Sequence, residues 1–241
     1  MSTHEHDQTR GDSTPYFKDG QAADLSCNEV SALCTKAARG AGMSWGMAQE
    51  AGFAAAWLTA RGIDGPGLIR QHLDRSKARQ WSDLCPLGAP GNWQGLAGPA
   101  LCPIHLGATI CDFANLDDGP LSGAMIALGP VATPALLLPF LADLAKTNAK
   151  AITLTSPDGS ICIGGDMDWL QGAVVTFDTP ECALQLAAAP ALPSAIHAPQ
   201  THKATTTPAT VQALNSRAMN TTVPASEASR AGAGSGQSDN D

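Results

Sequence analysis

The sequence lacks the features that mark most secreted, membrane-spanning and nucleic-acid-binding proteins. Its first 24 residues are polar and contain no apolar run, so they are typical of neither a signal peptide nor a transit peptide. Its seven cysteines form no CxxC pair, which fits a reducing compartment better than a disulfide framework. A net charge of −8 argues against nucleic acid and anionic membranes as partners. Together these absences predict a cytoplasmic protein with no nucleic-acid and no membrane partner.

Common cofactor motifs are missing as well. The sequence has no GxxxxGK[ST] phosphate-binding loop, and the glycines Gly40, Gly42 and Gly46 do not have the spacing of the dinucleotide fingerprint. Cys102-x-x-His105, with Cys111 and Asp112 following, offers metal-ligating atoms. The simpler interpretation is that these cysteines are small buried side chains near a loop histidine. We therefore expect no cofactor and no metal.

What the sequence does contain is a helical N-terminal region from Leu25 to Ile63. Ser26 and Glu29 have the spacing of a capping box, which predicts the start of a first helix. Ser44 is a suitable N-cap for a second helix, and Gly62 is suited to end it. A third helix is expected from Gly65-Pro66 to about Lys77. Along the second helix, small residues form a strip that predicts close packing against a neighbouring helix: Ala48, Ala51, Gly52, Ala55 and Ala56.

A mixed strand and helix region follows. Residues 80–120 are predicted to be long loops with short strands, and Leu121–Leu128 a strand that Gly129-Pro130 interrupts. Thr133 is predicted to cap a helix from Pro134 to Lys146, which Pro139 kinks or delays. Residues 151–155 and 160–163 are predicted to form an antiparallel hairpin, and 173–177 a further strand. Helices first and strands later predict an α+β fold: an N-terminal helical pair or triplet followed by this mixed region.

Composition predicts four segments along the chain. Residues 1–24 are expected to be a disordered polar tail, and 25–186 a single α+β domain. Residues 187–215 are rich in Ala, Pro and Thr and predict a linker or surface loop. Residues 216–241 form a Gly-rich C-terminal segment that we expect to dock on the domain.

Two segments resemble an uncharacterised bacterial domain-of-unknown-function family. One is Lys36–Gly46, with the sequence KAARGAGMSWG, and the other is the C-terminal run from Val223 to Asp241. The resemblance covers about residues 25–241 and leaves the polar N-terminal tail outside. It implies no mechanism.

The turn between the first two helices is the best candidate site in the N-terminal half. Arg39 precedes the turn, whereas Trp45 and Glu50 follow it. Free amides at the start of the second helix suit a carboxylate or a phosphate. The alternative is an ordinary helix corner in which Arg39 pairs with Glu50 in solvent and Trp45 enters the core. The basic residues Arg70, Arg75, Lys77 and Arg79 are interpreted as a solvated helix end.

The C-terminal segment adds the remaining candidate residues. Glycines there allow a nest of convergent amides around an anion, and an arginine suits a carboxylate or phosphate. The candidate ligand-binding residues of this segment are Ser226, Glu227, Ser229, Arg230, Gly232 and Gly234. No catalytic residue can be named.

Two functions remain open after the sequence is read. In the first, the protein handles a small anionic metabolite, as an enzyme or an enzyme subunit. In the second, it is a non-catalytic accessory protein whose Ala/Gly helical face and C-terminal tail bind a partner protein. The sequence also leaves room for a homo-oligomer. We favour the first because arginine, glutamate, serine and glycine residues gather near both family-like segments.

Overall fold

The structure is a computed structural model that describes residues 24–89, 92–95, 99–165, 167–190 and 205–221. The described residues form seven α-helices, in chain order α1 (Cys27–Gly40), α2 (Trp45–Thr59), α3 (Gly65–Arg75), α4 (Pro103–Asp112), α5 (Leu138–Thr147), α6 (Trp169–Thr176) and α7 (Pro208–Ala218). They also form six strands: β1 (Leu87–Ala89), β2 (Asn92–Gln94), β3 (Ile126–Ala132), β4 (Lys150–Ser156), β5 (Gly159–Ile163) and β6 (Glu181–Pro190). Three short 3-10 helices complete the list: η1 (Trp81–Leu84), η2 (Pro134–Leu137) and η3 (Met219–Thr221).

The six strands make one mixed sheet in the order β1-β2-β3-β6-β4-β5. Only the β2–β3 pair is parallel among the described pairs, and the others are antiparallel. β4 and β5 form the predicted hairpin, with Ser156 opposite Gly159 at its turn. The α+β class and the antiparallel hairpin are thus confirmed.

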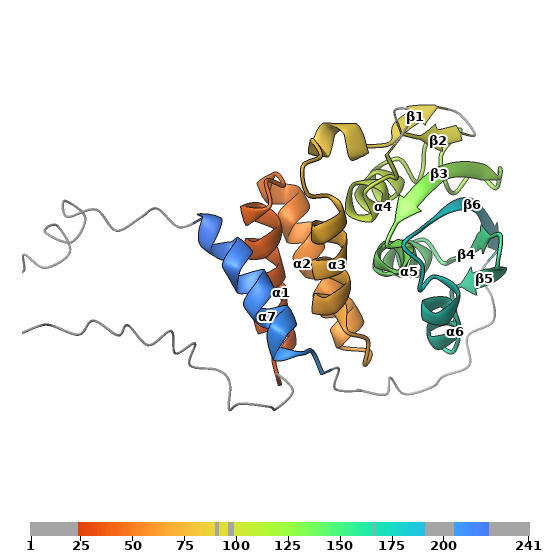
Figure 1. Cartoon of the computed structure of the whole chain (residues 1–241). Coiled ribbons are helices and arrows are strands. Elements are labelled where there is room, and N and C mark those ends of the chain that lie inside the picture. Colours follow the sequence, from red (N-terminus) through yellow and green to blue (C-terminus); the bar gives the residue numbers. More distant parts are fainter. Residues whose placement is uncertain (1–23, 90–91, 96–98, 166, 191–204, 222–241) are drawn as a thin grey trace, which may run out of the picture.

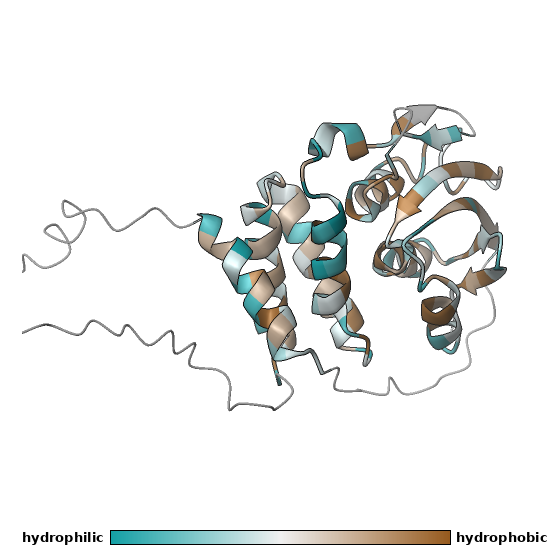
Figure 2. Ribbon diagram, viewed as in Figure 1, coloured by the Kyte–Doolittle hydropathy of each residue, from teal (hydrophilic) through white to brown (hydrophobic). Residues whose placement is uncertain are grey.

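The elements are arranged as a helical layer beside a sheet, with two helices between them (Figure 1). α1 packs against α2 and α7, and α3 packs against α2 and α7. α4 and α5 contact α2 on one side, and α5 contacts β4 on the other. Hydrophobic residues are concentrated in the strands and in the helices beside them, whereas α3 shows some of the most hydrophilic turns (Figure 2). α3 therefore offers polar side chains close to the sheet half of the molecule.

The start of α1 has the predicted capping box. The Glu29 amide donates to Ser26 Oγ over 3.3 Å, and the Ser26 amide donates to Glu29 Oε2 over 2.8 Å. This reciprocal pair satisfies amides that have no partner inside the helix. The cap fixes where α1 begins.

Replacing Ser26 by alanine is expected to lower the free energy of unfolding by about 1 kcal/mol, because a free helix amide loses its acceptor. Urea unfolding of the full chain measures the change. Ser216→Ala is the matched control, since Ser216 is exposed in α7 and its hydroxyl donates only to the Gln212 carbonyl. Equal losses in the two variants would contradict a specific role for the cap.

Four of the five residues of the small strip of α2 are buried, as the sequence predicts, whereas the fifth, Ala56, is half-buried. Ala48, Ala51, Gly52 and Ala55 are all buried, and a Cβ atom at Gly52 would overlap Thr35 Oγ1 of α1. The predicted end of this helix is also confirmed, because Gly62 has a φ of 80°. The strip serves the internal contact between α1 and α2.

Two helices occur where the sequence predicts other structure. α4 lies in the region predicted as loops and short strands, with Ile104, Leu106 and Ile110 buried at helical spacing. α6 replaces the strand predicted for 173–177, because it buries Leu170, Ala173 and Phe177 together on one face. Short apolar runs fit either period, and packing decides between them.

The prolines near β3 and α5 act differently from expectation. β3 continues through Gly129-Pro130, because a register shift between Leu128 and Pro130 accommodates the proline. Thr133 does not cap the next helix, since it is left-handed, with a φ of 47°, and makes no capping bond. Instead η2 precedes α5, so Pro139 delays the α-helix as predicted.

The last described helix differs from the predicted linker. α7 lies within and just beyond residues 187–215, and it buries Val211 and Leu214. Thr207 caps it by accepting from the Thr210 amide over 3.1 Å. β6 also extends to Pro190, four residues beyond the predicted domain end at 186. The composition, rich in Ala and Thr, predicted a linker, although this segment forms a short helix with one buried face.

Candidate functional site

At the α1–α2 turn, the predicted binding residue Arg39 interacts with other residues of the turn. Arg39 Nη1 donates to the Met43 carbonyl over 2.6 Å, and its guanidinium lies 5.2 Å from the centre of the Trp45 ring. Trp45 is 63% exposed, so it does not enter the core. Because its guanidinium is engaged inside the turn, Arg39 is a poor candidate for holding a ligand.

The same turn contains a GxSxG motif, which is typical of serine hydrolases and was not recognised from the sequence. Gly42-x-Ser44-x-Gly46 has the GxSxG spacing, which in hydrolases joins a strand to a helix and exposes the serine. Here the segment joins two helices, and Ser44 Oγ accepts from the Met47 amide as the N-cap of α2. No hydrogen bond joins Ser44 to a histidine among the described residues. The structure therefore explains this serine as a helix cap.

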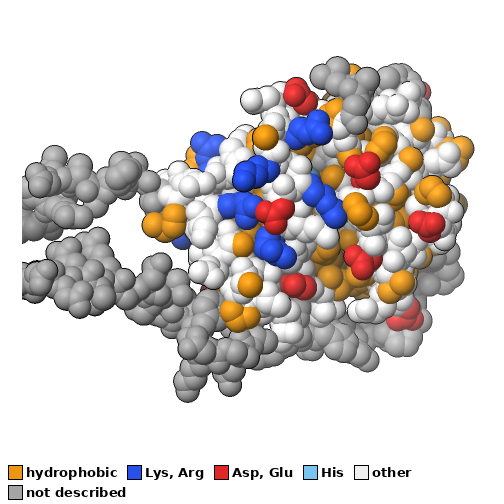
Figure 3. Space-filling model, in the orientation of Figure 1, with side chains coloured by type: hydrophobic (Ala, Val, Ile, Leu, Met, Phe, Trp, Pro, Cys, Tyr) orange, Lys and Arg blue, Asp and Glu red, His pale blue; other side chains and the backbone are white. Residues whose placement is uncertain are grey.

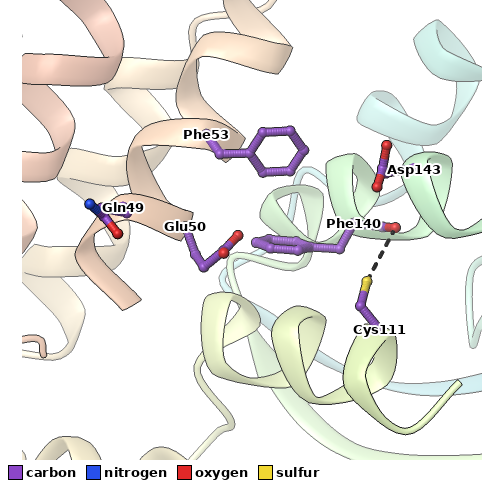
Figure 4. Close-up of a pocket in the computed structure, with 6 residues that line it drawn as sticks. All are labelled: Gln49, Glu50, Phe53, Cys111, Phe140 and Asp143. Atoms are coloured by element: carbon purple, nitrogen blue, oxygen red, sulfur yellow. Dashed lines mark hydrogen bonds between the residues drawn. The ribbon is translucent and has the colours of Figure 1, made fainter. Parts of the chain in front are cut away.

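Glu50 lies in a different place, in a pocket formed by α2, α4 and α5 (Figure 4). This acidic pocket has a volume of about 370 Å³ and is lined by Gln49, Glu50, Phe53, Cys111, Phe140 and Asp143. The rings of Phe53 and Phe140 meet edge to face, with centres 5.6 Å apart. Cys111 Sγ donates to the Phe140 carbonyl over 3.7 Å.

The electrostatics of the acidic pocket disfavour an anion. Burial, followed by the carboxylates of Asp112 and Asp143, raises the pKa of Glu50. Burial also raises the pKa of the Cys111 thiol to about 12, which leaves it protonated and weakly nucleophilic at neutral pH. The described lining contains no lysine or arginine. Arg39 donates to the Met43 carbonyl instead, so the alternative in which it pairs with Glu50 is not observed among the described residues.

The other predicted binding residues lie outside the described residues. They are Ser226, Glu227, Ser229, Arg230, Gly232 and Gly234.

Two histidine–cysteine pairs lie around Trp81. His72 Nε2 is 3.1 Å from Cys102 Sγ, and His105 Nδ1 is 3.0 Å from Cys85 Sγ. The Trp81 ring is stacked on His105 at 6.3 Å and tilted against His72 at 5.9 Å, measured between ring centres. These five side chains, from α3, η1 and α4 and their flanks, are the thiol–imidazole cluster.

Burial keeps the thiol–imidazole cluster neutral. It lowers the pKa of His72 to about 3, with smaller effects from His105 and Arg75. It also raises the pKa of Cys102 to about 12. Neutral thiols are poor nucleophiles, and among the described residues no three His, Cys, Asp or Glu side chains converge to hold a metal ion. The metal ligands considered from the sequence are also separated from one another, because Cys102 and His105 belong to this cluster whereas Cys111 lines the acidic pocket.

A second pocket lies between α3 and α6. This α3–α6 pocket has a volume of about 430 Å³ and is lined by Ile63, Asp64, Gly67, Leu68, Arg70, Gln71, Asp74, Arg75, Val174 and Asp178. On the face of the molecule in Figure 3, Lys and Arg side chains gather over the helical layer, whereas acidic side chains are spread more widely. The pocket joins basic residues of α3 to the sheet half of the molecule.

Three of the charged groups of this pocket already have partners. Asp64 accepts from the Gly67 amide over 2.9 Å and so caps α3. Asp74 forms an ion pair with Arg217 of α7. Arg75 Nη1 donates to the Pro180 carbonyl over 3.0 Å and lies 3.4 Å from Thr133 Oγ1.

Two charged groups of the pocket remain uncommitted. The Nε of Arg70 is buried and has no hydrogen-bond partner in the part of the chain that the structure describes. Within the same described residues, the Asp178 carboxylate forms neither a hydrogen bond nor an ion pair. A buried polar atom without a partner is costly. Five described side chains have one, namely Arg70, His72, His105, Trp169 and Thr206, and Arg70 is the one of them that lines this pocket.

Comparison with known families identifies the N-terminal part of the chain. Residues 25–98 match the model of the family Protein of unknown function (DUF3726). The sequence-based resemblance to a family of unknown function is confirmed for this segment. A search of curated proteins found no match to the chain.

The DUF3726 segment supplies part of the thiol–imidazole cluster and most of the lining of the α3–α6 pocket. It includes α1, α2 and α3, and with them Arg70 and His72. Sequence reasoning treated Arg70 as part of a solvated helix end. The sequence did offer one signal for this pocket. Arg70 and Asp74 lie four residues apart, as do Gln71 and Arg75, so these polar side chains fall on one side of α3.

Among the described helices, none combines the length and the apolarity that crossing a bilayer requires.

Proposed function

We propose that the protein binds a small anionic molecule in the α3–α6 pocket, with Arg70 holding its carboxylate or phosphate. The ligand class is the one favoured from the sequence, but the proposed site lies on α3 and not at Arg39, Trp45 and Glu50. The observation that supports the proposal is the buried, unpartnered Nε of Arg70 beside a cavity of about 430 Å³.

Guanidinium chemistry explains why an oxyanion suits this position. Arg presents N–H groups in a planar fork that matches two oxygen atoms of a carboxylate or phosphate. Arg70 lines the cavity, and no acceptor for its guanidinium is found among the described residues, so a bound oxyanion would supply one. Hydrogen bonds to charged groups contribute more than neutral ones. Gln71 lines the same pocket and offers a second donor group.

The pocket is equipped for binding rather than for covalent chemistry. Its described lining contains no Ser, Thr, Cys, His, Lys or Tyr, the residue types that most often act as nucleophile or general base besides carboxylates. The proposal is therefore limited to ligand binding.

The alternative function depended on an Ala/Gly face free to meet a partner protein. The structure buries Ala48, Ala51, Gly52 and Ala55 inside the fold, so that face is not available for docking. The tail that completed the alternative lies outside the described residues.

Phosphate and succinate are expected to raise the melting temperature of the full chain, because a ligand that binds only the folded state stabilises it by mass action. At ~100 times the Kd the stabilisation is about 2.7 kcal/mol. Replacing Arg70 by alanine is expected to weaken binding roughly 10- to 100-fold, the loss of one charge-assisted interaction.

Arg79→Ala is the matched control. Arg79 is exposed just beyond α3 and does not line the pocket, so its loss changes the net charge equally. Calorimetric titration with succinate measures each Kd. Equal weakening in both variants would show a general charge effect, and a wild-type chain that binds neither phosphate nor any carboxylate would refute the proposal.

A further inference from the structure

Opposite charges line the α3–α6 pocket without pairing with each other. Arg70 comes from α3, and Asp178 follows the end of α6, yet the structure describes no ion pair between them. The remaining charged lining residues are already engaged by a helix cap, by Arg217 of α7 or by a backbone carbonyl. One cationic and one anionic residue of the lining are thus left without a side-chain partner among the described residues.

From this arrangement we infer that the ligand of the pocket is a zwitterion, a small amino acid whose carboxylate binds Arg70 and whose ammonium group binds Asp178. The inference rests on the proposed function: it keeps the carboxylate that Arg70 holds and adds an ammonium group to the same molecule. A ligand carrying negative charge alone would satisfy Arg70 but would leave the Asp178 carboxylate of the same lining without a counter-ion. A ligand with both charges neutralises both groups in one binding event.

The uncharged lining favours an aliphatic side chain on that amino acid. Ile63, Leu68 and Val174 contribute the branched apolar surface of the pocket. Contact with such groups removes apolar area from water and stabilises an aliphatic ligand. The two charged groups would then set the orientation, and the apolar wall would receive the side chain.

Three related probes separate the contributions of the two charges. L-leucine carries both charges, 4-methylpentanoate lacks the amine, and 3-methylbutylamine lacks the carboxylate. For the wild-type chain we expect leucine to bind at least 10-fold more tightly than either probe that carries a single charge. Calorimetric titration, or chemical-shift titration where affinity is low, measures the three Kd values on the same full-length protein.

Asp178→Asn tests the role of the carboxylate while preserving its shape. In this variant we expect leucine binding to weaken at least 10-fold, whereas 4-methylpentanoate binds as well as before or better. Asp117→Asn is the control, because Asp117 is exposed in the loop after α4 and lies outside the pocket lining. Arg70→Ala is expected to weaken both leucine and 4-methylpentanoate.

The outcomes distinguish this inference from the proposed function. Equal affinity of leucine and 4-methylpentanoate for the wild-type chain would overturn the zwitterion and leave the anion site standing. Equal weakening of both probes by Asp178→Asn would also overturn it, because Asp178 would then shape the pocket rather than read an ammonium group. If no carboxylate or phosphate probe binds the wild-type chain, the proposed function itself fails.

Discussion

Replacing Gly52 by leucine is expected to lower the free energy of unfolding by about 1–3 kcal/mol or more. A Cβ atom at this position would overlap Thr35 Oγ1 and lie 2.7 Å from the Ser31 carbonyl oxygen. The threonine side chain can rotate away, but the carbonyl belongs to the backbone of α1. Adding a side chain therefore requires α1 and α2 to move apart, and their shared core is lost with the contact.

Gly46→Leu provides the control for this effect. Gly46 lies in the first turn of the same helix, is exposed, and would meet no atom within 4 Å if it carried a Cβ. We expect its stability to stay within about 0.5 kcal/mol of the wild-type value. Urea unfolding of both variants measures the difference, and a Gly52→Leu protein that unfolds like the wild type would show that α2 does not pack tightly on α1.

Acidification is expected to destabilise the protein through His72. Burial lowers the pKa of this histidine from 6.5 to about 3 in the folded state, whereas the unfolded chain keeps the ordinary value. Between these two pKa values the unfolded state binds more protons, so stability is fully present above pH 6.5 and falls as the pH drops toward 3. At pH 5, about 1.5 units into this window, the loss amounts to about 2 kcal/mol.

A His72→Gln variant is expected to lose most of this pH dependence. Its stability at pH 7.5 falls because the contact with Cys102 changes, but the decline from pH 7.5 to pH 5 flattens. Cys102→Ser is the control, since it perturbs the same contact and keeps the histidine. Urea unfolding at the two pH values measures the slope, and an unchanged slope in His72→Gln would assign the acid sensitivity to other groups.

The start of the fold could be predicted because its signals are local. Ser26 and Ser44 cap α1 and α2 through amides three residues away, and Gly62 ends the second helix with a left-handed turn. Such signals act within one helical turn, so they can be read without knowing the tertiary structure. The hairpin of β4 and β5 is equally local, because its turn residues lie between its own strands.

The elements that could not be predicted depend on distant packing. Residues 173–177 are apolar enough for a strand, but Leu170 and Ala173, three residues apart, are both buried, which is the spacing of one helix face and not of one strand face. β3 continues through Pro130 because a bulge against β6 absorbs the missing amide. The sequence of a segment alone does not determine which of its faces is buried. It also does not show whether a neighbouring strand can accommodate a proline.

The candidate site shows the same limit. Arg39 was identified correctly as a cation near a helix N-terminus, yet a carbonyl four residues away already occupies it. Arg70 was interpreted as a solvated residue, because Asp178, which lines the same pocket, is remote in the sequence and follows another helix. Which charges remain uncommitted can be established only after every local and distant partner has been assigned.

The position of α7 in the helical layer has a consequence for biosynthesis. α1 is synthesised before every other described helix, but its neighbour α7 is the last described helix, and Gly40 of α1 fits closely against the backbone of Arg217. At translation rates of ~5–20 residues per second, roughly ten seconds or more separate the emergence of the two helices. During that interval the apolar flank of α1 that α7 later covers is exposed to water. The nascent chain thus exposes this flank until α7 has been synthesised and has folded onto it.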